Sequence, residues 1–302
     1  MINSILEDIK IQFRDGNMLT RIIMINVLVF AVVRIIIALT GFSSGGSAGA
    51  SHELIKWLAI PSGFMDLLKK PWTLITHMFL HYGFWHLVWN MLWFYWFARI
   101  IGDFLGDRRV LPLYLLGGLA GAVLYLISDH LFPTGSGGHS IALGASAATS
   151  AFTIAAATLS PDYEFNLILL GRIKIKYIAA VKIFLDIIEI NGPNSGGHYG
   201  HLGGAILGFA FVYYLREGTD ITLPLQKLFS PNAVPQSSSQ PARAKKRSPI
   251  KVVYKNPNKE QPSKTENFED RLDIILDKIK KVGIENLSEE EKAFLDAASK
   301  KD

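Results

Sequence analysis

Cysteine is absent from the 302 residues of this chain. Without a thiol, the chain cannot form a disulfide framework, a thiolate nucleophile or a cysteine metal site. Charge is also scarce: 19% of the residues are Asp, Glu, Lys or Arg, against roughly 25% in soluble domains. Hydrophobic residues make up 49% of the chain and gather into long runs, which predicts a polytopic membrane protein rather than a soluble one.

The net charge of +5 is concentrated in loops and in the C-terminal part. We interpret this pattern as membrane topology, with the lipid bilayer as a partner and no nucleic acid. No cleavable signal peptide is expected, because the first apolar run starts near Arg21 after a polar, amphipathic stretch.

Six apolar stretches predict six membrane spans. They are residues 22–40, 86–101, 110–128, 145–159, 177–190 and 200–215. The segment 51–80 is broken by Pro61 and Pro71 and is expected to be re-entrant or interfacial. Arg34 lies inside the first span and should snorkel outward or face a protein partner.

Positive charge orients these spans. The loops after the second and fourth spans are basic, whereas the loops after the third and fifth carry no Lys or Arg. The positive-inside rule therefore predicts that both termini are cytoplasmic. Lys56, Lys69 and Lys70 in the longer first loop oppose this orientation mildly.

The expected fold class is all-α, a six-span bundle with a small soluble part after it. Residues 1–20 form an N-terminal cytoplasmic segment and residues 21–216 the membrane domain. Residues 217–265, rich in Pro, Ser, Gln and Lys, predict a disordered linker. Residues 266–302 regain helical periodicity, with a capping box from Ser288 to Glu291, and predict a cytoplasmic helical hairpin.

Polar side chains occur at one end of alternate spans. The second, fourth and sixth spans all run from outside to inside, so their N-terminal ends share the outer depth. These ends carry His86, Asn90, Ser146, His198 and His201. Because a polar group exposed to lipid costs roughly 2–3 kcal/mol on insertion scales, an intramembrane cluster of this kind indicates a functional site.

Small residues predict that two of these spans approach closely. Gly204 and Gly208 lie on the same helix face as His201, and alanines follow Ser146. This packing would bring Ser146, as nucleophile, within reach of His201, as general base and acid. His86, Asn90 and the Ser146 backbone N–H would line an oxyanion hole. No carboxylate is expected near His201, so the arrangement would be a dyad.

These residues carry a resemblance to the rhomboid family of intramembrane serine proteases. His86 and Asn90 match its HxxxN motif, residues 144–147 (GASA) approach its GxSG motif, and His201, Gly204 and Gly208 match HxxGxxxG. Residues 97–121 are also similar to the family's link between the second and third spans. The resemblance covers about residues 21–216.

Four positions depart from the family pattern. Ala147 replaces the second glycine of the GxSG motif and adds a methyl group beside the nucleophile. Thr73 follows Trp72 where the family commonly has Trp-Arg, Gly102 stands where a glutamate is frequent, and Ser150 stands where a tyrosine can pack against the histidine. None of these changes removes the expected dyad or the oxyanion donors.

Other roles are open to some of these residues. Ser146 alone would be read as a packing serine. His77, His81 and His86 could form a metal site, but without a carboxylate or an HExxH motif this is disfavoured. Lys182 and Asp186 are spaced as an i,i+4 pair that lowers the cost of burial. An ion-coupled transporter using this pair is the weaker alternative, because no inverted repeat is visible.

The resemblance implies a serine endopeptidase without cofactor or metal, acting on single-span membrane proteins. It implies a multi-pass protein of the cell (inner) membrane. The main rival is a catalytically inactive rhomboid-like factor that binds membrane proteins.

Overall fold

The computed structural model describes residues 2–43, 48–132, 140–167, 171–192, 194–229, 274–280 and 283–299. These residues belong to two compact units, Met1–Pro235 and Gln236–Asp302. Most of the predicted linker lies outside the described residues, although α11 (Leu223–Phe229) occupies part of its first thirteen residues.

The first unit is mostly helical. Its longer helices are α1 (Ile2–Asp15), α2 (Met18–Ser43), α3 (Ala48–Leu58), α6 (Phe84–Leu105), α7 (Val110–Leu131), α8 (Ser146–Leu159), α9 (Ile175–Ile188) and α10 (Ser195–Arg216). Its short elements are β1 (Ile60–Pro61), α4 (Phe64–Lys69), α5 (Thr73–Thr76), η1 (His77–Phe79), η2 (Asp107–Arg109), β2 (Ile141–Ala142), β3 (Glu164–Leu167), β4 (Gly171–Lys174) and η3 (Glu189–Asn191).

The described residues are mostly helical, in line with the all-α prediction, and two small sheets are added to the helices. Strand β1 pairs antiparallel with β2, with Ile60 opposite Ala142. Strands β3 and β4 form an antiparallel hairpin where the sequence predicted only a basic link. Two-residue strands such as β1 and β2 give no alternating pattern that could be read from the sequence. The first sheet matters for the site, because it fixes the chain four residues before Ser146.

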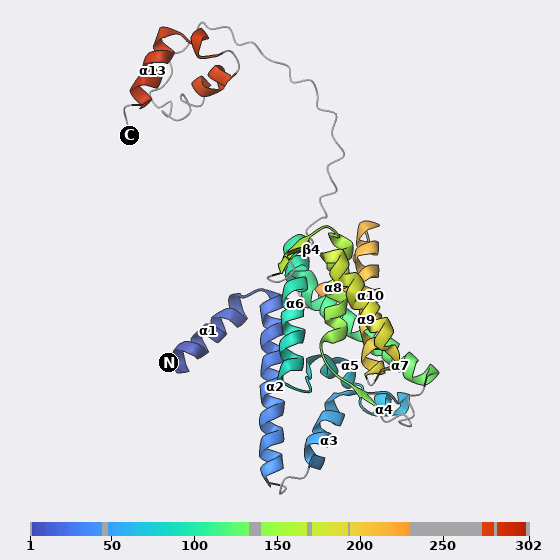
Figure 1. Ribbon diagram of the computed structural model, residues 1–302. Coiled ribbons are helices and arrows are strands. Elements are labelled where there is room, and N and C mark those ends of the chain that lie inside the picture. The colour runs from blue at the N-terminus through green and yellow to red at the C-terminus, as the bar shows by residue number, and fades with distance from the viewer. Residues whose placement is uncertain are drawn as a thin grey trace. The chain divides into compact units, whose positions relative to one another are not determined.

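Helix α8 lies at the centre of the bundle, in contact with α6, α7, α9 and α10 (Figure 1). Nine of its fourteen residues are buried, which suits its run of alanines. The chain alternates in direction from helix to helix, so α6, α8 and α10 begin at the same end of the bundle. In Figure 1 that end is the lower one, beside α4 and α5.

Glycines allow α10 to lie directly against α8. A Cβ atom on Gly204 would overlap the carbonyl oxygen of Ala147, and one on Gly208 would overlap that of Ala151. On the other side of α8, a Cβ on Gly117 of α7 would lie 2.7 Å from the Ala151 side chain. The predicted meeting of two small-residue faces is confirmed, with backbone in direct contact with backbone.

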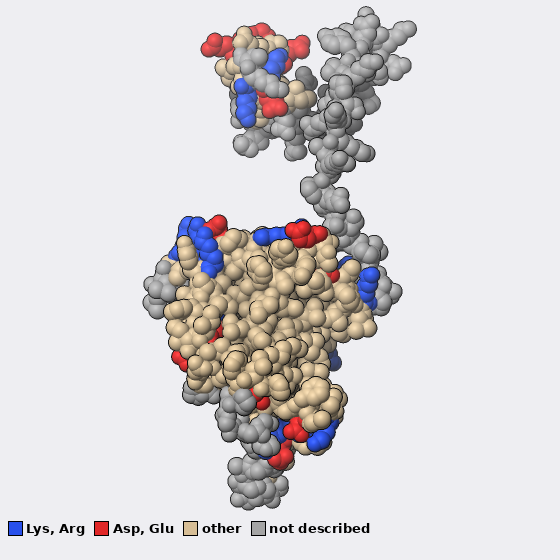
Figure 2. Space-filling view, turned by 90° about the vertical axis from the view of Figure 1, so that its right-hand side faces the viewer, with Lys and Arg blue, Asp and Glu red and all other residues tan. Residues whose placement is uncertain are grey.

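The surface of the first unit is largely apolar. Figure 2 shows a broad, mostly uncharged face with only scattered Lys, Arg, Asp or Glu at mid-height and larger clusters of charged side chains toward its two ends. Two helical segments, Met18–Thr40 and Asp107–Leu131, are long and apolar enough to cross a membrane, and Ser146–Leu159 is a shorter apolar helix. Arg34 is exposed on α2, with its guanidinium carbon 5.8 Å from the Phe30 ring centre.

The segment before α6 is broken into short elements, as predicted, and it buries two histidines. His77 lies in η1, with its ring Nδ1 2.7 Å from the Thr73 carbonyl oxygen, to which it donates a hydrogen bond. Burial lowers the pKa of His77 to about 4, and burial together with the nearby His86 lowers that of His81 to about 3. Both imidazoles are therefore neutral in the folded protein at pH 7.

We expect His77 to make the protein acid-sensitive. Its pKa is lower in the folded chain than the 6.5 of an exposed histidine, so the unfolded chain takes up the proton first. Its contribution is fully present above pH 6.5 and is lost as the pH falls toward 4, by about 3 kcal/mol at pH 4. Melting of the purified protein between pH 8 and 4 measures this loss. His77→Gln should reduce the slope and leave the part that is due to His81, and an unchanged slope would contradict the assignment.

The second unit contains the predicted capping box. The Ser288 backbone N–H donates to Glu291 Oε2 at 2.8 Å, and the Glu291 N–H donates to Ser288 Oγ at 3.3 Å. These bonds start α13 (Glu289–Ser299), which follows η4 (Ile284–Asn286) and the helical residues 274–280. Lys278 pairs with Glu291 at 2.7 Å and ties the two helices together.

Candidate active site

Ser146 is the first residue of α8 and follows a turn that is held by a hydrogen bond to the segment before α6. Gly144 has φ +124°, a conformation that favours glycine, and a Cβ atom there would lie 3.0 Å from the His86 ring. The Gly144 N–H donates to the His77 carbonyl at 2.8 Å. At a helix start, the first N–H groups have no partner within the helix, so they favour negative charge developing beside Ser146.

His86 and Asn90 lie one turn apart on α6 and face this turn. The Tyr82 backbone N–H donates to His86 Nδ1 at 3.3 Å, so Nε2 carries the ring proton and is a donor. The Asn90 side-chain amide is largely buried and donates to the His86 carbonyl at 2.8 Å. Both side chains line a cavity that Ser146 also borders, so they and the first N–H groups of α8 are donors available within that cavity.

A carboxylate lies next to His201, contrary to the sequence-based expectation of none. His201 Nδ1 is 2.7 Å from Asp186 Oδ1, and His198 Nδ1 is 3.0 Å from the same oxygen. Because an ionised carboxylate only accepts hydrogen bonds, Nδ1 of His201 carries the proton and Nε2 is left as a free acceptor. That tautomer is the one a general base needs.

Lys182 completes this cluster. Its Nζ is 2.7 Å from Asp186 Oδ2, which confirms the predicted i,i+4 pair. The signal for this cluster in the sequence is the presence of two charges, Lys182 and Asp186, on a short apolar segment. Their link to His201 could not be read from spacing, because it depends on how α9 packs against the start of α10.

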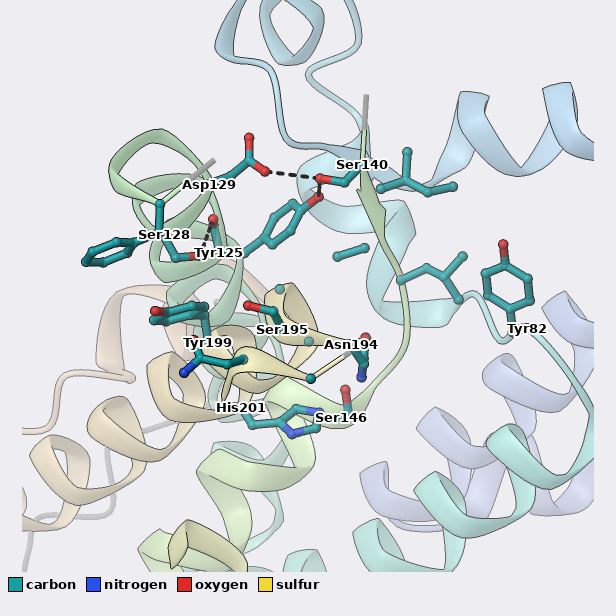
Figure 3. Close-up of a pocket in the computed structure, with 18 of the residues that line it drawn as sticks. Tyr82, Tyr125, Ser128, Asp129, Ser140, Ser146, Asn194, Ser195, Tyr199 and His201 are labelled. Atoms are coloured by element: carbon teal, nitrogen blue, oxygen red, sulfur yellow. Dashed lines mark hydrogen bonds between the residues drawn. The ribbon is translucent and has the colours of Figure 1, made fainter. Parts of the chain in front are cut away.

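Ser146 and His201 lie where two cavities meet. One cavity of about 1050 Å³ is lined by polar groups that include Tyr82, Asn194 and Tyr199. A second, of about 550 Å³, is mostly apolar and lies between α6 and α9. Asn90 lines both cavities as well. Figure 3 shows the His201 imidazole and the Ser146 side chain side by side in the polar cavity; among the described residues, no hydrogen bond joins the two.

The described residues contain one cluster with the composition of a metal site, made by Asp186, His198 and His201. Both ring Nδ1 atoms point at the same carboxylate oxygen, and Lys182 occupies the other. This is hydrogen-bond geometry, with protons where metal–ligand bonds would be needed. His77, His81 and His86 do not form such a cluster.

At two of the positions that depart from the family pattern, Ser150 and the Trp72-Thr73 pair, the side chains make other contacts. The Ser150 hydroxyl donates to the Ser146 carbonyl at 2.8 Å, within its own helix. Trp72 stacks on Trp57 with ring centres 5.6 Å apart, and its indole N–H donates to the Trp57 carbonyl. The ring of His201 is therefore held by Asp186 rather than by an aromatic residue at position 150.

Comparison with known proteins agrees with this geometry. Residues 68–218 match the Rhomboid domain, and residues 262–301 match a family of unknown function (DUF6576). The chain is 31% identical over 147 residues to the presenilin-associated rhomboid-like protein A, mitochondrial, of Danio rerio, covering 48% of this chain and 37% of that protein. It is 32% identical over 158 residues to the RHOMBOID-like protein 12, mitochondrial, of Arabidopsis thaliana, covering 48% and 47%.

The chain thus spans less than half the length of either relative. The matched Rhomboid domain nevertheless covers half of this chain and contains His86, Asn90, Ser146 and His201. This chain belongs to the rhomboid family.

Proposed function

We propose that the protein is an intramembrane serine endopeptidase that cuts transmembrane segments of other membrane proteins through Ser146 and His201. One observation carries this proposal: Ser146, His201 and Asn90 all border both a polar and an apolar cavity. Hydrolysis of a membrane-embedded peptide bond needs both kinds of access, one for water and one for an apolar segment.

The chemistry would follow the usual acyl-enzyme course. His201 Nε2 takes the Ser146 proton as Oγ bonds to the substrate carbonyl carbon, and the carbonyl oxygen becomes negative. The amide side chain of Asn90, Nε2–H of His86 and the α8 N–H groups are the donors for that oxygen. The C–N bond then breaks, and the same proton passes from His201 to the leaving amine. Water from the polar cavity then attacks the ester carbon, with His201 taking the proton of the water and returning it to Ser146 Oγ as the acyl group leaves.

The apolar cavity would receive the substrate. Trp89 and Trp93 of α6 form one wall, and Tyr177 and Val181 of α9 form the other. Trp89, Tyr177 and Val181 are exposed, so the cavity opens on the apolar flank of the bundle. We infer that a single-span protein docks here, with α9, the shorter helix, as the movable side.

We infer six spans for this domain, formed by α2, α6, α7, α8, α9 and α10, with both termini on the cytoplasmic side. Supporting this are the shared end of α6, α8 and α10 and the basic residues of the β3–β4 hairpin at the opposite end (Figure 1). We infer that the protein lies in an inner membrane; both relatives are named as mitochondrial proteins.

A fluorophosphonate probe tests the proposal, because it reacts only with an activated serine. In detergent, the full-length protein should be labelled, and Ser146→Ala and His201→Ala should both remain unlabelled. Labelling that survives in Ser146→Ala would contradict the assignment. A wild-type protein that stays unlabelled yet still binds a single-span substrate would support the inactive, membrane-protein-binding alternative.

A further inference from the structure

We propose that Asp186 is a positioning residue for His201, so that the site works as a serine–histidine–aspartate triad. This inference rests on the proposed function and deepens it. The family resemblance implied a dyad, and the third member comes from α9, a helix that contributes no residue to the matched motifs.

The contact between the two residues is short and directional. Asp186 Oδ1 accepts a hydrogen bond from His201 Nδ1 at 2.7 Å, a length typical of a charge-assisted bond. The Asp186 residue is 4% exposed, so water does not compete for this bond. The bond fixes the tautomer and the ring orientation, with Nε2 on the side of the ring opposite the carboxylate.

The neighbours of Asp186 keep its carboxylate ionised and fixed in position. A buried carboxylate is costly unless it is paired and fully hydrogen-bonded. Lys182 Nζ meets Oδ2 at 2.7 Å and His198 Nδ1 meets Oδ1 at 3.0 Å. The pair of Asp186 and Lys182 is neutral overall, so His201 can remain neutral at rest and become an imidazolium only when it accepts the Ser146 proton.

The contacts of Asp186 with His198 and His201 also allow a purely structural role, which an experiment has to distinguish from the positioning of His201. Asp186 lies on α9 and both histidines lie at the start of α10, so the cluster also ties these two helices together. If it served only as a clamp on the movable wall, its loss would change substrate binding. A positioning residue acts instead on turnover, because it works through the base.

Asp186→Asn in the full-length protein separates the two roles. An asparagine amide can donate to Nδ1 and so favours the wrong tautomer of His201. We expect kcat for a fluorescent transmembrane substrate to fall by at least about 10²-fold with KM within about twofold, and the rate of fluorophosphonate labelling to fall by a similar factor. His198→Gln, which leaves the His201 bond in place, should lower kcat far less.

Two further variants keep the test decisive. Glu189→Gln removes a carboxylate three residues further along, at an exposed position, and should retain wild-type kcat. Asp186→Asn combined with Lys182→Gln removes the charge pair together, so that no uncompensated lysine is left to unfold the protein. This double variant should melt near the wild type and still show the fall in kcat.

The outcomes separate this inference from the proposed function. Wild-type kcat in folded Asp186→Asn, or in the double variant, would overturn the triad while the Ser146-dependent cleavage stands. A rise in KM with kcat unchanged, shared by His198→Gln, would show a clamp instead. An unreactive wild-type protein would overturn the proposed function itself.

Discussion

Alanine at position 146 should abolish cleavage of a transmembrane substrate. The hydroxyl oxygen is the atom that forms the ester, and no other described residue at the junction of the two cavities offers an equivalent nucleophile. We expect a loss of roughly 10³-fold or more in kcat, with substrate binding retained. The measurement is the time course of product formation from a fluorescent single-span substrate in proteoliposomes, together with the affinity of the uncut substrate.

His201→Ala should cause a loss of similar size, since the serine is a weak nucleophile without its base. The two residues act as a unit, so the double variant should be no slower than either single variant. Ser160→Ala and His130→Ala make the same chemical changes at the far end of α8 and at the end of α7, and should cleave as fast as the wild type. Losses that multiply in the double variant would mean that the two side chains work independently.

The sequence was sufficient to predict the parts of the site that lie on regular helices. His86 and Asn90 are four residues apart, so a single helix places them on one face. Gly204 and Gly208 follow His201 at helical spacing and predict the close contact with α8. In each of these cases the prediction depends only on the residue spacing within one helix. It does not require knowing how that helix packs against the others.

What could not be predicted depends on contacts between elements. Asp186 reaches His201 because α9 folds back against the start of α10, and no periodicity in either segment encodes that register. The pairing of Ile60 with Ala142 joins residues that are 82 positions apart in the chain. Lys182 and Asp186 were correctly predicted to pair, but a pair that only lowers the cost of burial and a pair that holds a base look identical in the sequence.

Gly204→Ala should strongly lower the activity of the protein although it touches no reacting group. A methyl group at this position would overlap the carbonyl oxygen of Ala147, and that oxygen belongs to the backbone of the central helix. The helices α8 and α10 would have to separate. We expect a loss of about 1–3 kcal/mol in stability from overpacking, and a loss of kcat of roughly 10²-fold, since Ser146 and His201 lie on the two displaced helices.

Gly200→Ala supplies the matched control on the same helix. One turn before Gly204, an added Cβ would lie 3.8 Å from the Gly121 carbonyl oxygen, an ordinary contact. This variant should melt at or slightly above the wild-type temperature, because alanine favours the helix by about 0.5–1 kcal/mol over glycine, and it should keep its kcat. If Gly204→Ala also cleaved at the wild-type rate, backbone contact between α8 and α10 could not be what sets the distance from the serine to its base.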